Sequence, residues 1–193
     1  AVRFHFERDK RRFVMSRVGL RMVLGWYLGL SPDQIRFHYG EYGKPSLGNE
    51  HKGGLIQFNM AHSSELAICA FVRNISVGVD IEKIRTLPDA DQIAERFFSA
   101  AEYSDYQTVF DAQKSLAFFN CWTRKEAFIK AIGEGLSYPL HKFEVTLIPD
   151  DSAELREIYD DPQEAANWEI RSFIPAQGYL GAVAIREQGL KVR

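Results

Sequence analysis

The stretch Trp122-Thr-Arg-Lys-Glu-Ala-Phe-Ile-Lys-Ala-Ile-Gly-Glu-Gly135 closes a helical pattern that begins at Asp111. The two glycines at its end favour a stop, so the pattern predicts a helix over 111–132. On this helix Trp122, Glu126 and Lys130 are spaced four residues apart and lie close to one face. The simplest interpretation is a surface Glu–Lys pair worth a few tenths of a kcal/mol. An indole, a carboxylate and an amine in a row near a helix end are an unusual solvent face, which makes this face a candidate site.

The nearest strand-like run upstream is Val77-Gly-Val-Asp-Ile-Glu-Lys83. Side chains alternate along a strand, so Asp80 and Glu82 point the same way and their neighbours point to the core. Two carboxylates on one face repel each other unless a positive charge lies between them, and a hard cation such as Mg²⁺ meets that need with oxygen ligands. The alternative is an exposed edge strand with solvated acids, since Asp-x-Glu is a common spacing.

Three further groups of residues could meet a phosphate. His62 and Ser63 follow a strand-like run and can hydrogen-bond an anion, although a single histidine is more often structural. Lys44 lies in a Gly-Lys-Pro loop and can act as a point charge. Arg8 belongs to a basic helix start together with two later arginines, for which a solvated face is the default interpretation.

The order of elements indicates an α+β fold. Helical patterns are expected at 9–30, 89–98 and 111–132, with a capping box at Ser99 and Glu102, and 40–54 is expected to be a loop. Strand-like runs lie at 56–60, 66–71, 77–81, 143–147, 168–173 and 180–185, with a hairpin turn expected at 73–76. Helix, strands, helices and strands in this order predict two pseudo-symmetric lobes, each a small antiparallel sheet packed on a main helix, over residues 1–76 and 77–193.

Composition narrows the classes of function. The formal net charge of −2 gives no reason to expect a nucleic-acid partner. Two cysteines without a CxxC pattern predict free buried thiols and a reducing compartment. No apolar run is long enough for a membrane helix, and charges interrupt the start as they do not in a signal peptide. The expected location is the cytoplasm, with no membrane partner.

Each pattern is weak alone, but their order along the chain is specific. The sequence resembles the 4′-phosphopantetheinyl transferases of the longer, two-lobed Sfp type. The segments that carry the resemblance are Phe6-Glu-Arg-Asp9, Gly43-Lys-Pro45, Phe58-Asn-Met-Ala-His-Ser63, Gly78-Val-Asp-Ile-Glu82, Arg96-Phe-Phe-Ser99 and Trp122-Thr-Arg-Lys-Glu-Ala127. One departure is Ala61, where the family usually has serine, so a hydroxyl contact to the coenzyme is expected to be lost or replaced.

The resemblance implies two lobes with coenzyme A bound in the cleft between them. It implies Mg²⁺-dependent transfer of phosphopantetheine from coenzyme A to a serine of an apo acyl or peptidyl carrier protein, with release of adenosine 3′,5′-bisphosphate. Mn²⁺ is an alternative cation. The implied positions are as follows: Asp80, Glu82 and Glu126 bind the metal; Arg8, Lys44, His62 and Ser63 contact the coenzyme; Lys130 lies at the pyrophosphate.

The chemistry of the residues fits that assignment. Three carboxylates favour a divalent cation, and a lysine adds positive charge where a phosphoryl transition state needs it. Our hypothesis is that the catalytic residues are Glu126, which takes the serine proton directly or through a water, and Lys130, which orients the groups. Whether Glu126 is base, metal ligand or both stays open from sequence.

Two other functions remain possible at this stage. A metal-dependent phosphohydrolase or nuclease would use the same acids without a carrier, and a non-catalytic module would bind coenzyme A or carriers without transfer. Two lobes in one chain can build a cleft alone, so we expect a monomer. The stretch from Thr86 to Ala101 is expected to receive the carrier, with Leu87 and Ile93 in an exposed apolar patch and Phe97 or Phe98 in the core.

Overall fold

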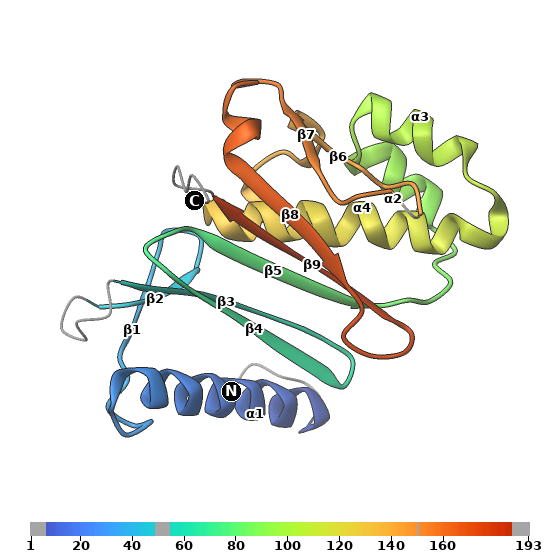
Figure 1. Cartoon of the computed structure of the whole chain (residues 1–193). Helices are drawn as coiled ribbons and strands as arrows, with labels where there is room; N and C mark the ends of the chain where they lie inside the picture. Colours follow the sequence, from blue (N-terminus) through green and yellow to red (C-terminus); the bar gives the residue numbers. More distant parts are fainter. Residues whose placement is uncertain (1–6, 49–54, 150, 187–193) are drawn as a thin grey trace.

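The computed structural model describes residues 7–48, 55–149 and 151–186, without the side chains of Arg8 and Asp9. Over these ranges the chain is α+β, with small antiparallel sheets (Figure 1). The helices are α1 (Glu7–Leu28), α2 (Ala90–Phe97), α3 (Ala100–Thr108), α4 (Asp111–Ile132) and the 3-10 turns η2 (Gly135–Ser137), η3 (Leu140–Lys142) and η4 (Glu164–Asn167). The strands are β1 (Phe37–Tyr39), β2 (Pro45–Leu47), β3 (Ile56–Ser63), β4 (Leu66–Arg73), β5 (Val77–Lys83), β6 (Phe143–Val145), β7 (Leu155–Ile158), β8 (Trp168–Phe173) and β9 (Tyr179–Arg186).

Helix signals in the sequence give most of the helix ends. The helix α4 has the predicted bounds, and Gly133 ends it in the left-handed conformation at φ 88°. The capping box is confirmed, because the Ser99 and Glu102 side chains each accept a backbone N–H of the other residue. The prediction that Asp9 starts the first helix is wrong, since α1 begins at Glu7.

The predicted pairing of the early strands is corrected by the structure. The strand β3 pairs with β4 from Ile56↔Arg73 to Ser63↔Leu66, so the tight turn lies between Ser63 and Leu66. The turn predicted at 73–76 joins no hairpin, because β5 pairs with β9 instead of β4. The region 40–54 is also not all loop, since β2 lies inside it and pairs with β1.

Both long helices pack on small antiparallel sheets. Leu20 and Leu24 of α1 are buried with Phe58 of β3, and Figure 1 shows α1 beneath the β3–β4 hairpin. The helix α4 lies against the three-stranded sheet in the order β5-β9-β8. The apolar pattern that predicted α1 is only partly buried, for Trp26 is 80% exposed.

The core is built around α4 and contains a buried ion pair. Lys125 donates to the backbone oxygens of Leu140 at 2.7 Å and Phe143 at 2.6 Å, and its Nζ lies 2.8 Å from Glu102 Oε2. Glu102 also accepts the N–H of Val145 at 2.7 Å. A buried charge is tolerated only when paired and hydrogen-bonded, and these contacts join α3, α4 and β6.

The two larger sheets meet where β3 runs along the free edge of β5, a contact called here the sheet junction. Ala61 is buried there with Val79 and Ile81. Asn59 Oδ1 accepts the N–H of Val79 at 2.9 Å, and the Ser63 hydroxyl accepts the N–H of Lys83 at 3.1 Å. Residues four apart on one strand share a face, so two side chains of β3 replace ladder bonds along β5.

In the part of the chain that the structure describes, no helix has the length and apolar character needed to cross a membrane.

Candidate active site

The two acids of β5 share one face, as their spacing predicts. Asp80 is buried, with 5% of its surface exposed, and Glu82 is half-buried. Val79 and Ile81 point the other way, into the sheet junction. The acids therefore face α4, which packs on the same side of β5 as Gly78.

Gly78 is what lets the helix come close to this strand. A Cβ added at Gly78 would lie 2.0 Å from the Ala127 carbonyl oxygen and 2.3 Å from the Ala131 nitrogen, distances that no side chain can occupy. Ala127 and Ala131 directly follow Glu126 and Lys130, so this approach brings those two side chains to the acids of β5.

Glu126, Lys130 and Asp80 form one group. Lys130 Nζ lies 2.5 Å from Asp80 Oδ1 and 3.8 Å from Glu126 Oε2. Trp122, predicted on the same helix face, stacks instead on Phe118 with ring centroids 5.9 Å apart. The indole is thus part of the aromatic packing, and the polar site consists of the carboxylates and the amine.

Burial makes the carboxyl groups of Asp80 and Glu126 costly to ionise. It raises the pKa of Asp80 to about 7, against the lowering effect of the Lys130 ammonium, and the charges of Glu126 and Glu82 add to the rise. Burial also raises the pKa of Glu126, while Lys130 lowers it and Glu82 raises it. The negative charge of Glu82 therefore raises the pKa of both Asp80 and Glu126, and a positive charge among the three acids relieves this repulsion.

The residues fit a divalent cation by their chemistry. All three carboxylates supply oxygen, the ligand atom that Mg²⁺ and Mn²⁺ prefer. Asp80 Oδ2 is buried and has no hydrogen-bond partner among the described residues. The described ranges hold no set of three or more His, Cys, Asp or Glu side chains already arranged around a metal position, and the Lys130 ammonium lies against Asp80.

Glu82 is held from two sides. The Ser63 hydroxyl donates to Glu82 Oε2 at 2.8 Å, and Arg85 donates to the same oxygen at 3.3 Å. Ser63 thus faces the acid site, whereas the preceding residue, His62, is exposed on the opposite side of β3.

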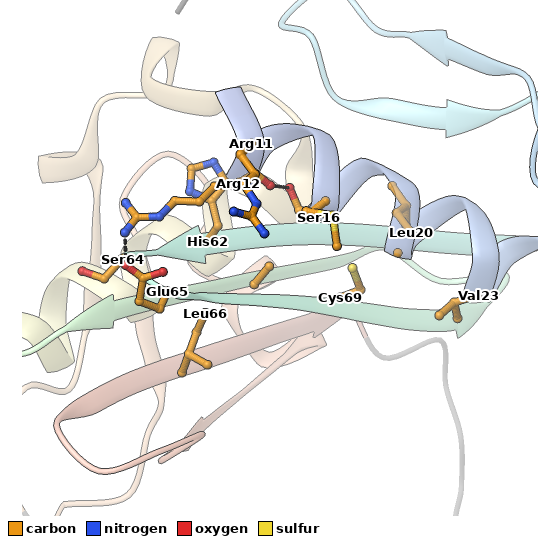
Figure 2. Close-up of a pocket in the computed structure, with 13 residues that line it drawn as sticks. Arg11, Arg12, Ser16, Leu20, Val23, His62, Ser64, Glu65, Leu66 and Cys69 are labelled. Carbon is orange, nitrogen blue, oxygen red and sulfur yellow. Dashed lines mark hydrogen bonds and ion pairs between the residues drawn. The ribbon is translucent and has the colours of Figure 1, made fainter. Parts of the chain in front are cut away.

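His62 lies in a hollow of about 660 Å³ between α1 and the β3–β4 hairpin. Figure 2 shows Arg11, Arg12 and His62 gathered at one end of this hollow, with Leu20 and Cys69 toward the other. Arg12 forms an ion pair with Glu65 in the hairpin turn. The hollow therefore offers basic groups at one end and an apolar wall at the other.

Lys44, predicted to meet a phosphate, is placed elsewhere. Its Nζ donates to the backbone oxygens of Ala131 at 2.8 Å and Val77 at 3.2 Å, and burial lowers its pKa to about 8. The structure does not bring it to the hollow that His62 lines. Arg8 lies in α1, but its side chain lies outside the described part of the chain.

Two family models match most of this chain. Residues 76–184 match the family model described as the 4′-phosphopantetheinyl transferase superfamily. Residues 1–73 match a second model, described as 4′-phosphopantetheinyl transferase, N-terminal. The chain belongs to the 4′-phosphopantetheinyl transferase superfamily. It is therefore a transferase, and the family expected from the ordered motifs is confirmed.

Curated relatives cover nearly all of this transferase. It is 38% identical to the 4′-phosphopantetheinyl transferase HetI of Nostoc sp. (strain PCC 7120 / SAG 25.82 / UTEX 2576), over 96% of this chain and 75% of the relative. It is 35% identical to the 4′-phosphopantetheinyl transferase Sfp of Bacillus subtilis (strain 168), over 94% of this chain and 76% of the relative. Among solved structures, the holo-[acyl-carrier-protein] synthase of Thermotoga maritima matches 59% of this chain and 64% of its own, at a TM-score of 0.46 and 22% identity.

The sequence patterns indicate no role for some residues that shape the transferase site. Asn59 belongs to a family-like segment, but its bond to Val79 depends on where β3 meets β5. Lys125 precedes Glu126 and turns into the core, which helical spacing alone could indicate because adjacent residues face different ways. Ala61, where a lost coenzyme contact was expected, is buried in the sheet junction and does not line the hollow.

The proposed carrier surface is also less exposed than expected. Leu87 and Ile93 are half-buried against the main core of the transferase, so each exposes less apolar surface than the expected patch requires. Phe98 is buried and Phe97 is half-buried beside Trp122, as expected for at least one of the pair.

Proposed function

We propose that this chain transfers the 4′-phosphopantetheine arm of coenzyme A to a serine of an apo acyl or peptidyl carrier protein in a reaction that requires Mg²⁺ or Mn²⁺. The observation that carries the proposal is the group of Asp80, Glu126 and Lys130, joined across β5 and α4 in a chain of this superfamily. The negative charge of Glu82 raises the pKa of Asp80 and of Glu126, which makes Glu82 the third acid of the proposed site. The product left behind is adenosine 3′,5′-bisphosphate.

Asp80, Glu82 and Glu126 are the residues that would hold the cation. A divalent cation held there would neutralise negative charge on the oxygens of the two phosphates of the pyrophosphate. The bare Oδ2 of Asp80 and the oxygen-only donor set support this assignment. Lys130 already lies on Asp80, so its ammonium is close to where the pyrophosphate charge would gather.

The transfer is a nucleophilic displacement at one phosphorus. The serine oxygen of the carrier forms a bond to the phosphorus that bears the pantetheine arm, and the bond from that phosphorus to the bridging oxygen breaks. The serine proton passes to Glu126, directly or through a water, and adenosine 3′,5′-bisphosphate leaves. The raised pKa of Glu126 moves this carboxyl toward the range in which a general base works well.

Coenzyme contacts divide between residues with free access and residues already engaged. His62 is exposed in the hollow beside Arg11, which supports a contact to a coenzyme phosphate. Lys44 and Ser63 would have to give up hydrogen bonds to backbone oxygens and to Glu82, respectively, to bind the coenzyme. Arg8 stays a prediction.

We expect the boundary between the two lobes near residue 76. One family model ends at residue 73 and the other begins at residue 76, which supports this boundary. We expect a monomer acting in the cytoplasm, on carriers of fatty-acid, polyketide or nonribosomal-peptide synthesis. Gel filtration tests whether the protein is a monomer. Parallel assays with each apo-carrier show which class of carrier it modifies fastest.

The test of the function is mass spectrometry of an apo-carrier incubated with coenzyme A and Mg²⁺. We expect a mass gain of one phosphopantetheine arm, lost when the metal is chelated. Phosphoester hydrolysis without a carrier would favour the phosphohydrolase alternative, and binding without transfer would favour the non-catalytic module.

Replacing Glu126 by Gln tests the proton acceptor. We expect Glu126→Gln to lower kcat by about 100-fold or more, since general-base catalysis contributes roughly 10²–10⁴-fold. Glu157→Gln, at an exposed position of β7, is the matched control and should keep the wild-type kcat. Near-normal turnover by Glu126→Gln would contradict both the base and the ligand role.

A further inference from the structure

The hydroxyl of Ser63 is oriented by two contacts at once. It accepts the N–H of Lys83 at 3.1 Å and donates to Glu82 Oε2 at 2.8 Å. A hydroxyl has one proton, and the backbone N–H of Lys83 can only donate, so the hydroxyl proton is directed to the carboxylate. Ser63 therefore fixes the carboxylate of Glu82 relative to the backbone of its own strand.

The other contact of Glu82 does not impose the same restraint. Arg85 lies three residues away, after the end of β5, and its side chain is 52% exposed. An exposed ion pair of this kind adds little, because water competes for both charges and the long side chain has many rotamers. Without Ser63, the Glu82 carboxylate would be free to follow Arg85 into solvent.

Ser63 is itself held in place by the rest of the molecule. Asn59, on the same face of β3, bonds Val79 and so fixes the alignment of β3 with β5. Just past Ser63, the N–H of Glu65 donates to the Tyr179 hydroxyl at 3.4 Å, and the Glu65 side chain pairs with Arg12. The serine is thus anchored on both sides before it meets Glu82.

We propose that Ser63 is a positioning residue that sets the orientation of the Glu82 carboxylate for the divalent cation, instead of binding a coenzyme phosphate. The proposal rests on the proposed function, in which Glu82 is a metal ligand. Partners that orient a ligating carboxylate commonly change metal affinity by about 10–100-fold when they are removed.

The experiment compares the wild type with Ser63→Ala, Ser63→Thr and the control Ser104→Ala, an exposed serine of α3. Mn²⁺ binding is measured by electron paramagnetic resonance in the presence of coenzyme A, and KM for coenzyme A is measured at saturating Mg²⁺. We expect Ser63→Ala to weaken Mn²⁺ binding by about 10-fold with KM for coenzyme A unchanged within about 2-fold. Ser63→Thr, which keeps the hydroxyl, should restore binding, and Ser104→Ala should match the wild type.

A second arm separates positioning from a loss of folding. In a Glu82→Gln background, adding Ser63→Ala should change Mn²⁺ binding no further, because the carboxylate it orients is gone. Unchanged Mn²⁺ affinity in Ser63→Ala with a raised KM for coenzyme A would overturn the proposal in favour of a direct coenzyme contact. If Ser63→Ala weakens Mn²⁺ binding as expected but the wild type modifies no apo-carrier, the proposed function fails and the positioning role stands.

Discussion

Lys44 donates its ammonium hydrogens to two backbone oxygens, and one of them belongs to Ala131 in the last turn of α4. Unpaired carbonyls at a helix end carry partial negative charge, so a lysine is well placed there. The cost is burial, which lowers the pKa of this lysine from 10.5 to about 8. The hydrogen bonds of Lys44 thus link the loop before β2 to the end of α4 and to the start of β5.

The lowered pKa of Lys44 predicts that the stability of the protein depends on pH. Between pH 8 and 10.5 the unfolded chain keeps the Lys44 proton while the folded chain has lost it, so the free energy of unfolding rises with pH in this window. Urea unfolding at pH 7.5 and 10 should show the wild type gaining on the order of 2 kcal/mol relative to Lys44→Met. A constant difference at both pH values would refute the shift, and Lys142→Met, at an exposed ion pair, should show no such change.

At the scale of elements, the contact of β5 with α4 depends on one position without a side chain. A methyl group at Gly78 would overlap the backbone of α4 at Ala127 and Ala131, so the helix would have to move away from the strand. Such a movement would separate Lys130 from Asp80, since the helix carries one and the strand the other.

Gly78→Ala should therefore damage both stability and transfer. We expect a loss of roughly 1–3 kcal/mol or more in the free energy of unfolding, the range found for overpacked cores, with a fall in kcat of at least about 10-fold. Thermal unfolding and the carrier assay measure the two effects. Gly19→Ala in α1, where an added Cβ meets no atom within 4 Å, should leave the free energy of unfolding unchanged or slightly higher. Because Gly19 lines the proposed coenzyme hollow, this variant is a control for stability alone. A Gly78→Ala protein as stable as the wild type would show that the helix can shift without cost.

Sequence patterns predicted those parts of the site that depend on one element. Alternation along β5 placed Asp80 and Glu82 together, and helical spacing placed Glu126 beside Lys130. The hairpin prediction at 73–76 is wrong, although Asn74 favours a turn and does adopt φ 59°. The turn that does join a hairpin contains Ser64 at φ 50° and has no glycine or asparagine to indicate it. The position of β9 between β5 and β8, and the contact of Ser63 with Glu82, depend on residues far apart in sequence and had no local signal.

At the scale of the whole molecule, the proposed coenzyme hollow and the acid site lie on different sides of β3. His62 faces the hollow, while the next residue, Ser63, reaches Glu82. Two adjacent residues of one strand thus connect the two sites, and they remain in place only if β3 stays aligned with β5. Asn59 is the buried polar residue that fixes this alignment, since its Oδ1 satisfies an N–H at the edge of β5.

Removing that amide should therefore weaken both sheets together. Asn59→Ala leaves the N–H of Val79 buried without its partner, at a cost of about 1–3 kcal/mol, and loosens the junction that Ala61 and Ile81 fill. Hydrogen–deuterium exchange should become faster in β3–β4 and in β5–β9 alike, while Asn167→Ala, which removes an exposed bond to Glu164, should leave both unchanged. Faster exchange confined to β3–β4 would mean that the three-stranded sheet holds the acid site without support from the hairpin, and that the two sheets unfold as separate units.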